Sequence, residues 1–499
     1  MVSPHFPRIL FGVFLIAGTG AFAPAQEATP ADLDAAVREA LRVWEVPGAA
    51  VVVVRGDTLM HLKGYGRREL GRIAPITADT VFPLASCTKA FTAVGLAIAV
   101  DDGKFTWDDP VRKHLPDFQL FDKNATELVT LRDLVCHRTG VGGHDLLWYR
   151  TPWGQTESIR RISRIPPSGP FRATFAYQSV MFMAAGQAAG KYYLGGWAGL
   201  TRERILVPLG MTATTLSEPD PAKSGDRAAG HRKARDGTIG RTPEYPMPEP
   251  NPAGSVHTTA RDLGKWLQFQ LGDGTNIRGK RVVSQAGLRE THTPQTIIPL
   301  EGPARAMNPH THFLTYAMGW VAQDYRGVKV QSHAGWIDGF RVQLTLIPEK
   351  KIGFALLANL HGTRMNLALS NRFIDLLMNF PETDWNAHYG GLDRADEAAA
   401  ERGRRDRDAG RKPDEKPSLP LAAFVGEYEH PAYGTCKVTL DKGQLRWEWS
   451  SFAKELEPYR GDVFEIHDEV LRDPLVAFTV ERERVATLRA LDVEFRKVK

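Results

Sequence analysis

The chain has 499 residues, which is enough for two or three domains. Hydrophobic residues make up 42% and charged residues 24%, the ordinary balance of a soluble globular protein. The formal net charge of +5 is too small for a dedicated nucleic-acid binder, and no basic cluster lies without acidic neighbours. We therefore expect no nucleic-acid partner.

The first 25 residues have the pattern of a targeting segment. Arg8 gives a weakly basic start, residues 9–23 are apolar, and small residues close the stretch. This pattern predicts a cleavable signal peptide over residues 1–25 and a periplasmic or secreted mature protein. The alternative is an uncleaved membrane anchor, although the run is short for a full span, and no later segment is long and apolar enough for one.

Strands are predicted near both ends of a large domain. Residues 31–45 have helical periodicity, and residues 49–54 and 58–66 form a hairpin rich in β-branched residues. A second hairpin joins residues 341–347 to 351–357, and a helix follows over 363–380. From about 110 to 250, helices and loops dominate. The order predicts an α+β fold, an α/β sandwich over residues 26–390 with one antiparallel sheet flanked by helices and a helical insertion.

Two further segments complete the chain. Residues 391–417 mix eight basic and eight acidic side chains, which predicts a solvated helix or linker. Residues 418–499 alternate like strands and predict a small all-β, barrel-like domain. Trp447 and Trp449 lie on one face of such a strand, where they form either core or, less commonly, a ligand pocket.

The tetrapeptide Ser86-Cys87-Thr88-Lys89 opens a long apolar helix, residues 90–100. A serine and a lysine three residues apart on a helix lie one turn apart and point the same way. The positive end of the helix dipole disfavours the ammonium form of Lys89 and favours negative charge on the Ser86 oxygen. The spacing therefore predicts Ser86 as nucleophile and Lys89 as its base. The surrounding apolar helix is typical of a domain centre.

The neighbouring Cys87 is a weaker candidate for the nucleophile, because it lacks the three-residue spacing to Lys89. We expect a small buried thiol. With Cys136 and Cys436 it makes an odd, sparse set, which argues against a disulfide framework in an exported protein.

Two later segments supply what an acyl-transfer site needs besides a nucleophile. Tyr177 precedes an apolar helix, and an ammonium nearby would lower the pKa of its phenol and favour phenolate, which could shuttle protons. His333-Ala334-Gly335 precedes Trp336, and its small residues allow a strand edge to approach a substrate backbone. The backbone N–H groups of Ser86 and Trp336 are the candidate oxyanion hole.

These motifs, in this order, resemble the serine β-lactamase and penicillin-binding protein superfamily, in its class C β-lactamase, D,D-peptidase and esterase branch. Ser86 to Lys89 matches the first motif. Tyr177-Gln178-Ser179 lies where the family has Tyr-x-Asn, and His333-Ala334-Gly335 where it has Lys-Thr-Gly or His-x-Gly. The resemblance covers about residues 32–380. It implies a β-lactamase-like fold and catalytic Ser86, Lys89 and Tyr177, with an appended β domain of open role.

One departure concerns the substrate. The family asparagine donates to the substrate amide carbonyl and helps to hold the lysine, and Ser179 replaces it with a shorter side chain that has one donor. We expect Ser179, His333, Ala334 and Gly335 to bind substrate, His333 through a donor or a positive charge. Because amides and β-lactams depend more on the missing asparagine, esters are the more secure substrates.

The sequence thus predicts an exported serine hydrolase that forms an acyl-enzyme with a small-molecule or peptide substrate: a D-amino-acid peptide, a short ester or a β-lactam. The alternative is a binding or scaffold protein on a catalytically weak fold. The β domain could also cap the cleft and limit substrate size. His310 and His312 have metal-like spacing but no third ligand nearby, so we expect loop histidines, no metal and no cofactor.

Overall fold

The computed structural model describes residues 28–217, 225–247, 249–468, 471 and 474–498. The predicted signal peptide lies outside these ranges. An eight-stranded antiparallel sheet forms the first domain, in the order β2-β1-β12-β11-β10-β9-β8-β7. Its strands are β1 (Gly48–Arg55), β2 (Thr58–Gly66), β7 (Thr296–Ile297), β8 (Leu314–Tyr316), β9 (Val321–Tyr325), β10 (Val328–Ile337), β11 (Phe340–Ile347) and β12 (Ile352–Ala358).

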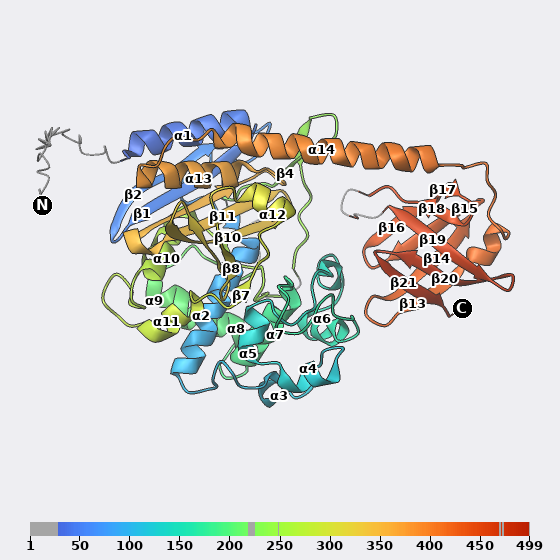
Figure 1. The fold of residues 1–499 in the computed structure, drawn as a ribbon, viewed down its shortest axis with the longest axis horizontal. Helices are drawn as coiled ribbons and strands as arrows, with labels where there is room; N and C mark the ends of the chain where they lie inside the picture. The colour runs from blue at the N-terminus through green and yellow to red at the C-terminus, as the bar shows by residue number, and fades with distance from the viewer. Residues whose placement is uncertain (1–27, 218–224, 248, 469–470, 472–473, 499) are drawn as a thin grey trace, which may run out of the picture.

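The sheet joins strands from both ends of the domain. Strand β1 pairs with β2 and with β12, so the two hairpins predicted from the sequence meet in the middle of one sheet. Every residue of β12 is buried, as is β1 apart from its last residue, because helices cover both faces. Helices α1 (Pro30–Val43) and α13 (Met365–Met378) lie on one face, and α10 (Ala260–Leu271) packs on β1 and β12 from the other (Figure 1). This is the predicted α/β sandwich.

A largely helical region occupies the space below the sheet in Figure 1. Its centre is α2 (Thr88–Asp101), which is apolar on all sides and packs against α7 (Ser179–Gly190) and α11 (Gln285–Thr291). The remaining helices are α3 (Val111–His114), α4 (Lys123–Leu128), α5 (Leu131–Val135), α6 (Gln155–Ile162), α8 (Gly196–Thr201), α9 (Val207–Leu209) and α12 (Gly302–Met307). Single 3₁₀ turns form η1 (Ala85–Cys87), η2 (Asp145–Leu147) and η4 (Pro348–Lys350), and η3 (Arg202–Leu206) is a short π-helix. Two small ribbons pair β3 (Phe82–Pro83) with β6 (His257–Thr258), and β4 (His231–Lys233) with β5 (Ile239–Arg241).

The charged segment begins as part of the first domain. Helix α14 (Trp385–Gly410) starts earlier than residue 391, with Trp385 and Tyr389 buried against the α1–α13 layer, and then runs out toward the C-terminal domain (Figure 1). Its mixed charges face solvent over the exposed part. Within the described ranges, none of the helices combines the length and apolar character that crossing a bilayer requires.

The C-terminal domain is a nine-stranded antiparallel sheet in the order β16-β15-β14-β13-β21-β20-β19-β18-β17. The two outer strands are consecutive in the chain and separated by Leu456 alone, so the sheet wraps into a nearly closed barrel, as predicted. Trp447 and Trp449 are core residues, 0% and 2% exposed. The strands, after the turn η5 (Leu421–Phe424), are β13 (Gly426–His430), β14 (Gly434–Asp441), β15 (Gln444–Trp449), β16 (Phe452–Glu455), β17 (Glu457–Arg460), β18 (Val463–Glu465), β19 (Leu475–Glu481), β20 (Arg484–Ala490) and β21 (Val493–Lys497).

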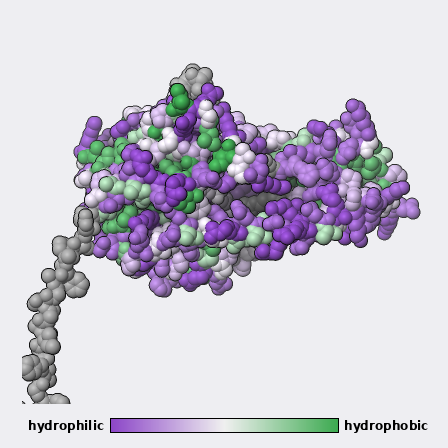
Figure 2. Space-filling model, turned by 90° about the horizontal axis from the view of Figure 1, so that it is seen from above, coloured by the Kyte–Doolittle hydropathy of each residue, from purple (hydrophilic) through white to green (hydrophobic). Residues whose placement is uncertain are grey.

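The barrel touches the helical region. Arg161 of α6 donates to the carbonyl of Ala432 at 2.9 Å, and Trp153 packs edge-on against Trp449 with ring centroids 6.2 Å apart. The view from above in Figure 2 shows hydrophilic residues over most of both domains, with hydrophobic residues in small separate patches. The described residues on that face therefore form no extended apolar docking surface.

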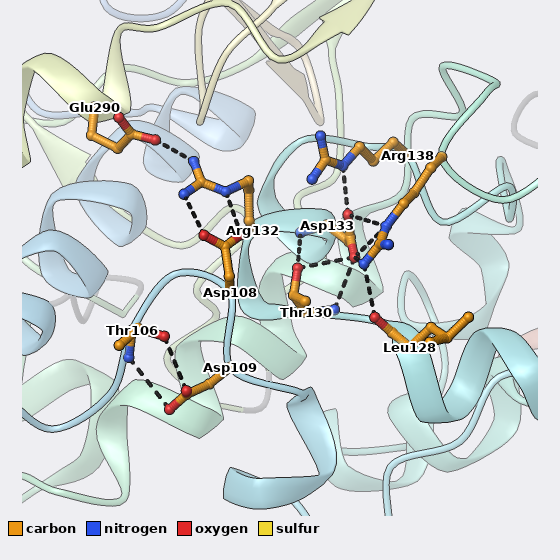
Figure 3. Close-up of polar contacts among 10 residues, drawn as sticks. Thr106, Asp108, Asp109, Leu128, Thr130, Arg132, Asp133, Arg138 and Glu290 are labelled. Carbon is orange, nitrogen blue, oxygen red and sulfur yellow. Dashed lines mark hydrogen bonds and ion pairs between the residues drawn. The ribbon is translucent and has the colours of Figure 1, made fainter.

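A buried ion-pair cluster fixes the loops below the sheet (Figure 3). Asp133 of α5 is completely buried and accepts hydrogen bonds from Arg138 Nε at 2.5 Å, Arg172 Nη2 at 2.8 Å and the backbone N–H of Thr130 at 2.9 Å. Burial alone would raise the pKa of Asp133, but these donors outweigh it and the pKa is lowered. The cluster joins the end of α5 to the segment that leads to Tyr177.

Replacing Asp133 by asparagine should destabilise the fold strongly, because two arginines would lose their buried partner. We expect a loss of about 3–5 kcal/mol in the free energy of unfolding, measured by urea denaturation. The matched control is Asp108→Asn, since Asp108 pairs with Arg132 but its side chain is 67% exposed. That change should cost about 1 kcal/mol or less. Equal losses in the two variants would contradict the structural role given to Asp133.

Candidate active site

The candidate nucleophile sits on a tight turn between a strand and a buried helix. Strand β3 leads into η1, and Ala85 has a φ of 46°, a left-handed conformation that is unusual for alanine. The N–H of Leu84 bonds to the carbonyl of Val256 at 2.7 Å and anchors the approach. Ser86 is therefore held at the N-terminal end of α2, as the sequence predicted.

Lys89 lies one turn further along and is completely buried. Its Nζ is 3.2 Å from Ser86 Oγ, 3.3 Å from Ser179 Oγ and 3.0 Å from the carbonyl oxygen of Ala253. All three are neutral groups. Aromatic faces of Tyr177 and Phe182 complete the surroundings, with ring centroids 5.0 and 5.5 Å from Nζ.

Burial lowers the pKa of Lys89 from its ordinary 10.5 to about 7, because no carboxylate bonds directly to the ammonium. The charge of Asp145 acts in the opposite direction but does not outweigh burial. A large fraction of Lys89 is therefore neutral near neutral pH, and its lone pair is free to accept the proton of Ser86. A pKa near neutrality is what a general base requires, and that role of Lys89 stays a prediction.

Tyr177 reaches the same serine but in a different protonation state from the one predicted. Burial raises the pKa of Tyr177, and its hydrogen bond with Ser86 only partly opposes this. The expected phenolate is wrong, because a desolvated phenol beside a largely neutral lysine stays protonated. Tyr177 is consequently a protonated hydrogen-bond partner of Ser86, and its part in proton transfer stays a prediction.

His137 and Gln178 hold Tyr177 from behind. The ring centroids of His137 and Tyr177 are 4.1 Å apart, and the backbone N–H of Gln178 donates to His137 Nδ1 at 3.1 Å. The Gln178 side chain caps α7 by accepting from the N–H of Val180 at 3.0 Å. Together these contacts fix the phenol relative to the helix that carries Ser179.

Ser179 is the first residue of α7 and lies beside Lys89 as the motif predicts. Its hydroxyl is one of the three polar contacts of the lysine, and its side chain is 3% exposed. The hydroxyl therefore shares in holding the lysine, as the family asparagine does. A role toward substrate stays a prediction.

His333 is neutral in this site, so of its two predicted roles, a donor or a positive charge, the positive charge is wrong. It is 4% exposed, its Nδ1 donates to the carbonyl of Ala334 at 2.8 Å, and its Nε2 accepts from the hydroxyl of Tyr316 at 3.1 Å. Burial lowers the pKa of His333 to about 3, with the charge of Lys89 as a second cause. The histidine therefore fixes residues 333–335 of strand β10 and carries no charge for a substrate carboxylate.

Gly335 allows strand β10 to press against the nucleophile turn. A Cβ at this position would lie 2.2 Å from the carbonyl oxygen of Leu84, so any other residue would collide with backbone. The buried thiol of Cys87 donates to the carbonyl of His333 at 3.2 Å and ties the same segments together. Burial raises the pKa of Cys87 to about 12, so this thiol is structural, as predicted.

An open strand edge lies beside the turn. Strand β9 pairs with β10 only as far as Ser332, which leaves residues 333–337 without a strand partner on that side among the described residues. Trp336 follows the tight contact at Gly335, and its indole is 56% exposed. The predicted oxyanion hole at the N–H groups of Ser86 and Trp336 lies where these two segments meet, and it stays a prediction.

Four contributors had no role in the sequence reasoning. They are Ala253, whose carbonyl bonds to Lys89, Asp145, whose charge acts on it, and the aromatic neighbours His137 and Tyr316. Ala253 precedes Gly254-Ser255, and His137 is followed by Arg138-Thr139-Gly140. Both stretches resemble segments that surround the catalytic motifs in the superfamily, so they could have drawn attention to these two residues. Nothing local marks Asp145 or Tyr316, because they reach the site only through the fold.

The candidate metal pair proves to be loop histidines. His310 contacts Arg326 at 3.0 Å, and His312 Nδ1 bonds to Asp324 at 2.7 Å. Within the part of the chain that the structure describes, no three histidine, cysteine or acidic side chains gather as a metal site would require.

An antiparallel sheet between helices, with a serine and a buried lysine paired at the start of the central helix, is the architecture of a β-lactamase-fold hydrolase. The family model described as Beta-lactamase matches residues 33–378, and the chain therefore belongs to the serine β-lactamase and penicillin-binding protein superfamily. A second model, a domain of unknown function (DUF3471), matches residues 410–498, the C-terminal β domain.

Known proteins resemble the chain over both domains. The unguisins hydrolase ungD' of Aspergillus campestris is 33% identical over 441 residues, covering 83% of this chain and 78% of that protein. The octameric penicillin-binding protein homologue of Pyrococcus abyssi superposes with a TM-score of 0.60 at 20% identity, and SurE with D-Leu with 0.54 at 20%; each comparison covers 94% of this chain and 99% of the other. At this identity the structures support the fold.

The pKa of Lys89 predicts the pH dependence of the reaction. Because the base must be neutral, kcat/KM should rise as pH increases through about 7, with a slope of one on a logarithmic plot. In Asp145→Asn the charge that raises the pKa of Lys89 is removed, so the rise should move to lower pH. A rise near 10 in both proteins would contradict a neutral lysine.

The contact at Gly335 predicts a second outcome. Gly335→Ala should abolish most activity, because the added Cβ must push β10 away from Leu84 and displace Trp336. Initial rates at saturating substrate measure the loss, which we expect to be about a hundredfold or more for a displacement of about 1 Å. Gly240→Ala, where a Cβ meets open space, is the control and should retain activity.

Proposed function

We propose that this protein is a serine hydrolase that forms an acyl-enzyme on Ser86. The single observation that carries the proposal is a buried, carboxylate-free Lys89 with its Nζ 3.2 Å from Ser86 Oγ. A scaffold protein has no need for a lysine kept neutral by burial next to a serine, since burying this side chain costs stability. The alternative of a catalytically weak binding protein becomes an outcome of the test below.

The first half of the reaction follows from the contacts of Ser86. Lys89 takes the proton of the hydroxyl while Oγ attacks the substrate carbonyl carbon, and the N–H groups of Ser86 and Trp336 stabilise the negative oxygen. Tyr177, protonated and bonded to Ser86, gives its proton to the leaving group as the carbon–leaving-group bond breaks. The proton on Lys89 then returns to the Tyr177 oxygen, and the acyl-enzyme remains.

The second half reverses these roles. Water replaces the leaving group, gives a proton to Lys89 and attacks the ester carbonyl, and the Ser86 oxygen regains a proton as the acid product leaves. An amine in place of water would give acyl transfer by the same steps. Lys89 has the pKa for both directions, because a base near 7 both accepts and returns a proton readily at neutral pH.

The substrate class we propose is a peptide amide or ester with a D-amino acid at the scissile carbonyl. Support comes from a relative named for hydrolysis of unguisins and from a structural neighbour solved with D-Leu. The open edge of β10 at residues 333–337 fits an extended backbone. Ser179 and the neutral His333 argue against a dedicated penicillinase, because neither provides the cationic or amide donor of that motif.

Export through a cleaved signal is part of the proposal and rests on residues 1–25 alone. It is checked by N-terminal sequencing of the protein secreted by a host that expresses the full chain. A mature start near Gln26 is expected.

The test of the proposed chemistry is a substrate panel with wild type and Ser86→Ala. Nitrocefin, p-nitrophenyl esters and D- and L-amino-acid p-nitroanilides are compared, together with mass spectrometry of the protein after short incubation. Wild type should acylate on Ser86 and hydrolyse at least one D-configured substrate, and Ser86→Ala should lose about 10⁴-fold or more in kcat. Activity that survives in Ser86→Ala would refute the mechanism. Folded wild type that neither turns over substrate nor labels with a fluorophosphonate would favour the scaffold function.

A further inference from the structure

One segment of the helical region spans the reaction centre from Tyr177 to the end of β10. We call residues 143–154 the strap. At its first residue, the N–H of Gly143 donates to the carbonyl of Tyr177 at 3.2 Å, and the Gln178 side chain donates to the carbonyl of Gly143 at 2.7 Å. The strap therefore begins directly against the candidate proton donor.

Further along, the strap is bonded to the turn that follows strand β10. The hydroxyl of Tyr149 donates to Asp338 Oδ1, and the backbone N–H of Tyr245 donates to Asp338 Oδ2 at 2.8 Å. Asp338 is 6% exposed, has a φ of 38°, and lies two residues after Trp336. A buried carboxylate in a strained conformation is therefore held by the Tyr149 hydroxyl of the strap.

A small pocket lies at the Asp338 end of the strap. It is lined by residues of the nucleophile approach, of the segment beside Lys89 and of the end of β10, among them Pro83, Gly254, Ile337 and Asp338. Asp145, on the strap, is close enough for its charge to act on both Lys89 and Tyr177. The strap thus contacts the carbonyl of Tyr177 and the Gln178 side chain at one end, and Asp338, which lines the pocket, further along.

The C-terminal domain holds the strap from outside. The hydroxyls of Ser450 and Ser451 both donate to the carbonyl of Arg150, at 2.8 and 2.9 Å, next to Tyr149. His144 Nδ1 and the hydroxyl of Tyr433 lie 2.8 Å apart near its beginning. The strap is consequently clamped between the β domain on one side and the site on the other.

The direction in which a substrate lies across the site decides which part of it meets the Tyr149–Asp338 contact. Tyr177 must reach the leaving group, and its ring lies 6.3 Å from that of His333, at the start of the open edge of β10. The leaving group therefore faces His333, and the acyl portion extends toward Ile337 and Asp338. The Tyr149–Asp338 contact closes that end.

We propose that Tyr149 and Asp338 determine specificity for the acyl portion of the substrate, and that the C-terminal domain keeps their contact closed. A short acyl group fits inside the strap, whereas a long one requires the Tyr149–Asp338 bond to open. The inference rests on the proposed acyl-enzyme function. It adds selection by the length of the acyl group, which neither the catalytic residues nor strand β10 provides.

The experiment varies the acyl group with the leaving group held constant. Values of kcat/KM are measured for p-nitrophenyl acetate and p-nitrophenyl octanoate with wild type, Tyr149→Phe and Asp338→Asn. Removing a hydrogen bond to a charged group changes an equilibrium by about tenfold, so the octanoate-to-acetate ratio should rise by about that factor in both variants. Tyr192→Phe, which removes a hydroxyl bonded to His114 elsewhere in the helical region, is the control and should leave the ratio unchanged.

A double variant tests the part played by the β domain. Ser450→Ala with Ser451→Ala removes both donors to Arg150 and should raise the same ratio in the same direction. A ratio that stays at the wild-type value in all the strap variants, in protein of wild-type melting temperature, would overturn the inference while leaving the acyl-enzyme intact. Loss of the Ser86 dependence would instead overturn the proposed function. The two failures are therefore distinguishable.

Discussion

The site depends on one constraint, a lysine buried without a carboxylate. Helices α2 and α7 are apolar on nearly every side, and their crossing removes Lys89 from water. Its three polar neighbours are neutral oxygens, and the charge of Asp145 compensates the ammonium only in part. The cost of burying the ammonium is avoided by losing the proton, which produces a base at neutral pH. The same desolvation keeps Tyr177 protonated and His333 neutral, so one physical cause sets the protonation of all three groups.

The second constraint is steric. The nucleophile turn and strand β10 come from distant parts of the chain, yet a Cβ at Gly335 would lie 2.2 Å from the Leu84 carbonyl. The thiol of Cys87 bonds across the same gap. Close packing here means that strand β10, which carries the predicted oxyanion donor Trp336, cannot move independently of the serine. Behind it, the Asp133 cluster and the His137 contact hold the loops that carry Tyr177, so the reactive groups are fixed by buried polar contacts whose partners lie on separate elements.

The C-terminal domain contacts the segments that surround the candidate site. Its barrel has its own core of aromatic residues, but its contacts with the first domain concentrate on residues 144–161, directly beside the active site. Helix α14 fixes the distance between the two units, because its first turns are buried under the sheet domain and its last turn meets the barrel at Tyr459. The C-terminal domain is thereby placed to influence the position of residues 144–161 beside the candidate site.

The sequence by itself determined the elements and the order of the motifs. Both hairpins, the central helix and the barrel were predictable because hydrophobic periodicity and turn residues are local. Ser86 and Lys89 were predictable from helical spacing taken together with the later motifs in family order. The protonation states were not predictable. The phenolate expected for Tyr177 was wrong, and so was the positive charge that was one of the two roles open to His333. A pKa depends on how much water the complete fold removes, which no local pattern records. Asp145, Tyr316 and the bond from Tyr149 to Asp338 likewise exist only where distant segments meet. Residue type and spacing along the chain determined which groups are candidates for reaction. The tertiary structure decided their charge, their partners and the space around them.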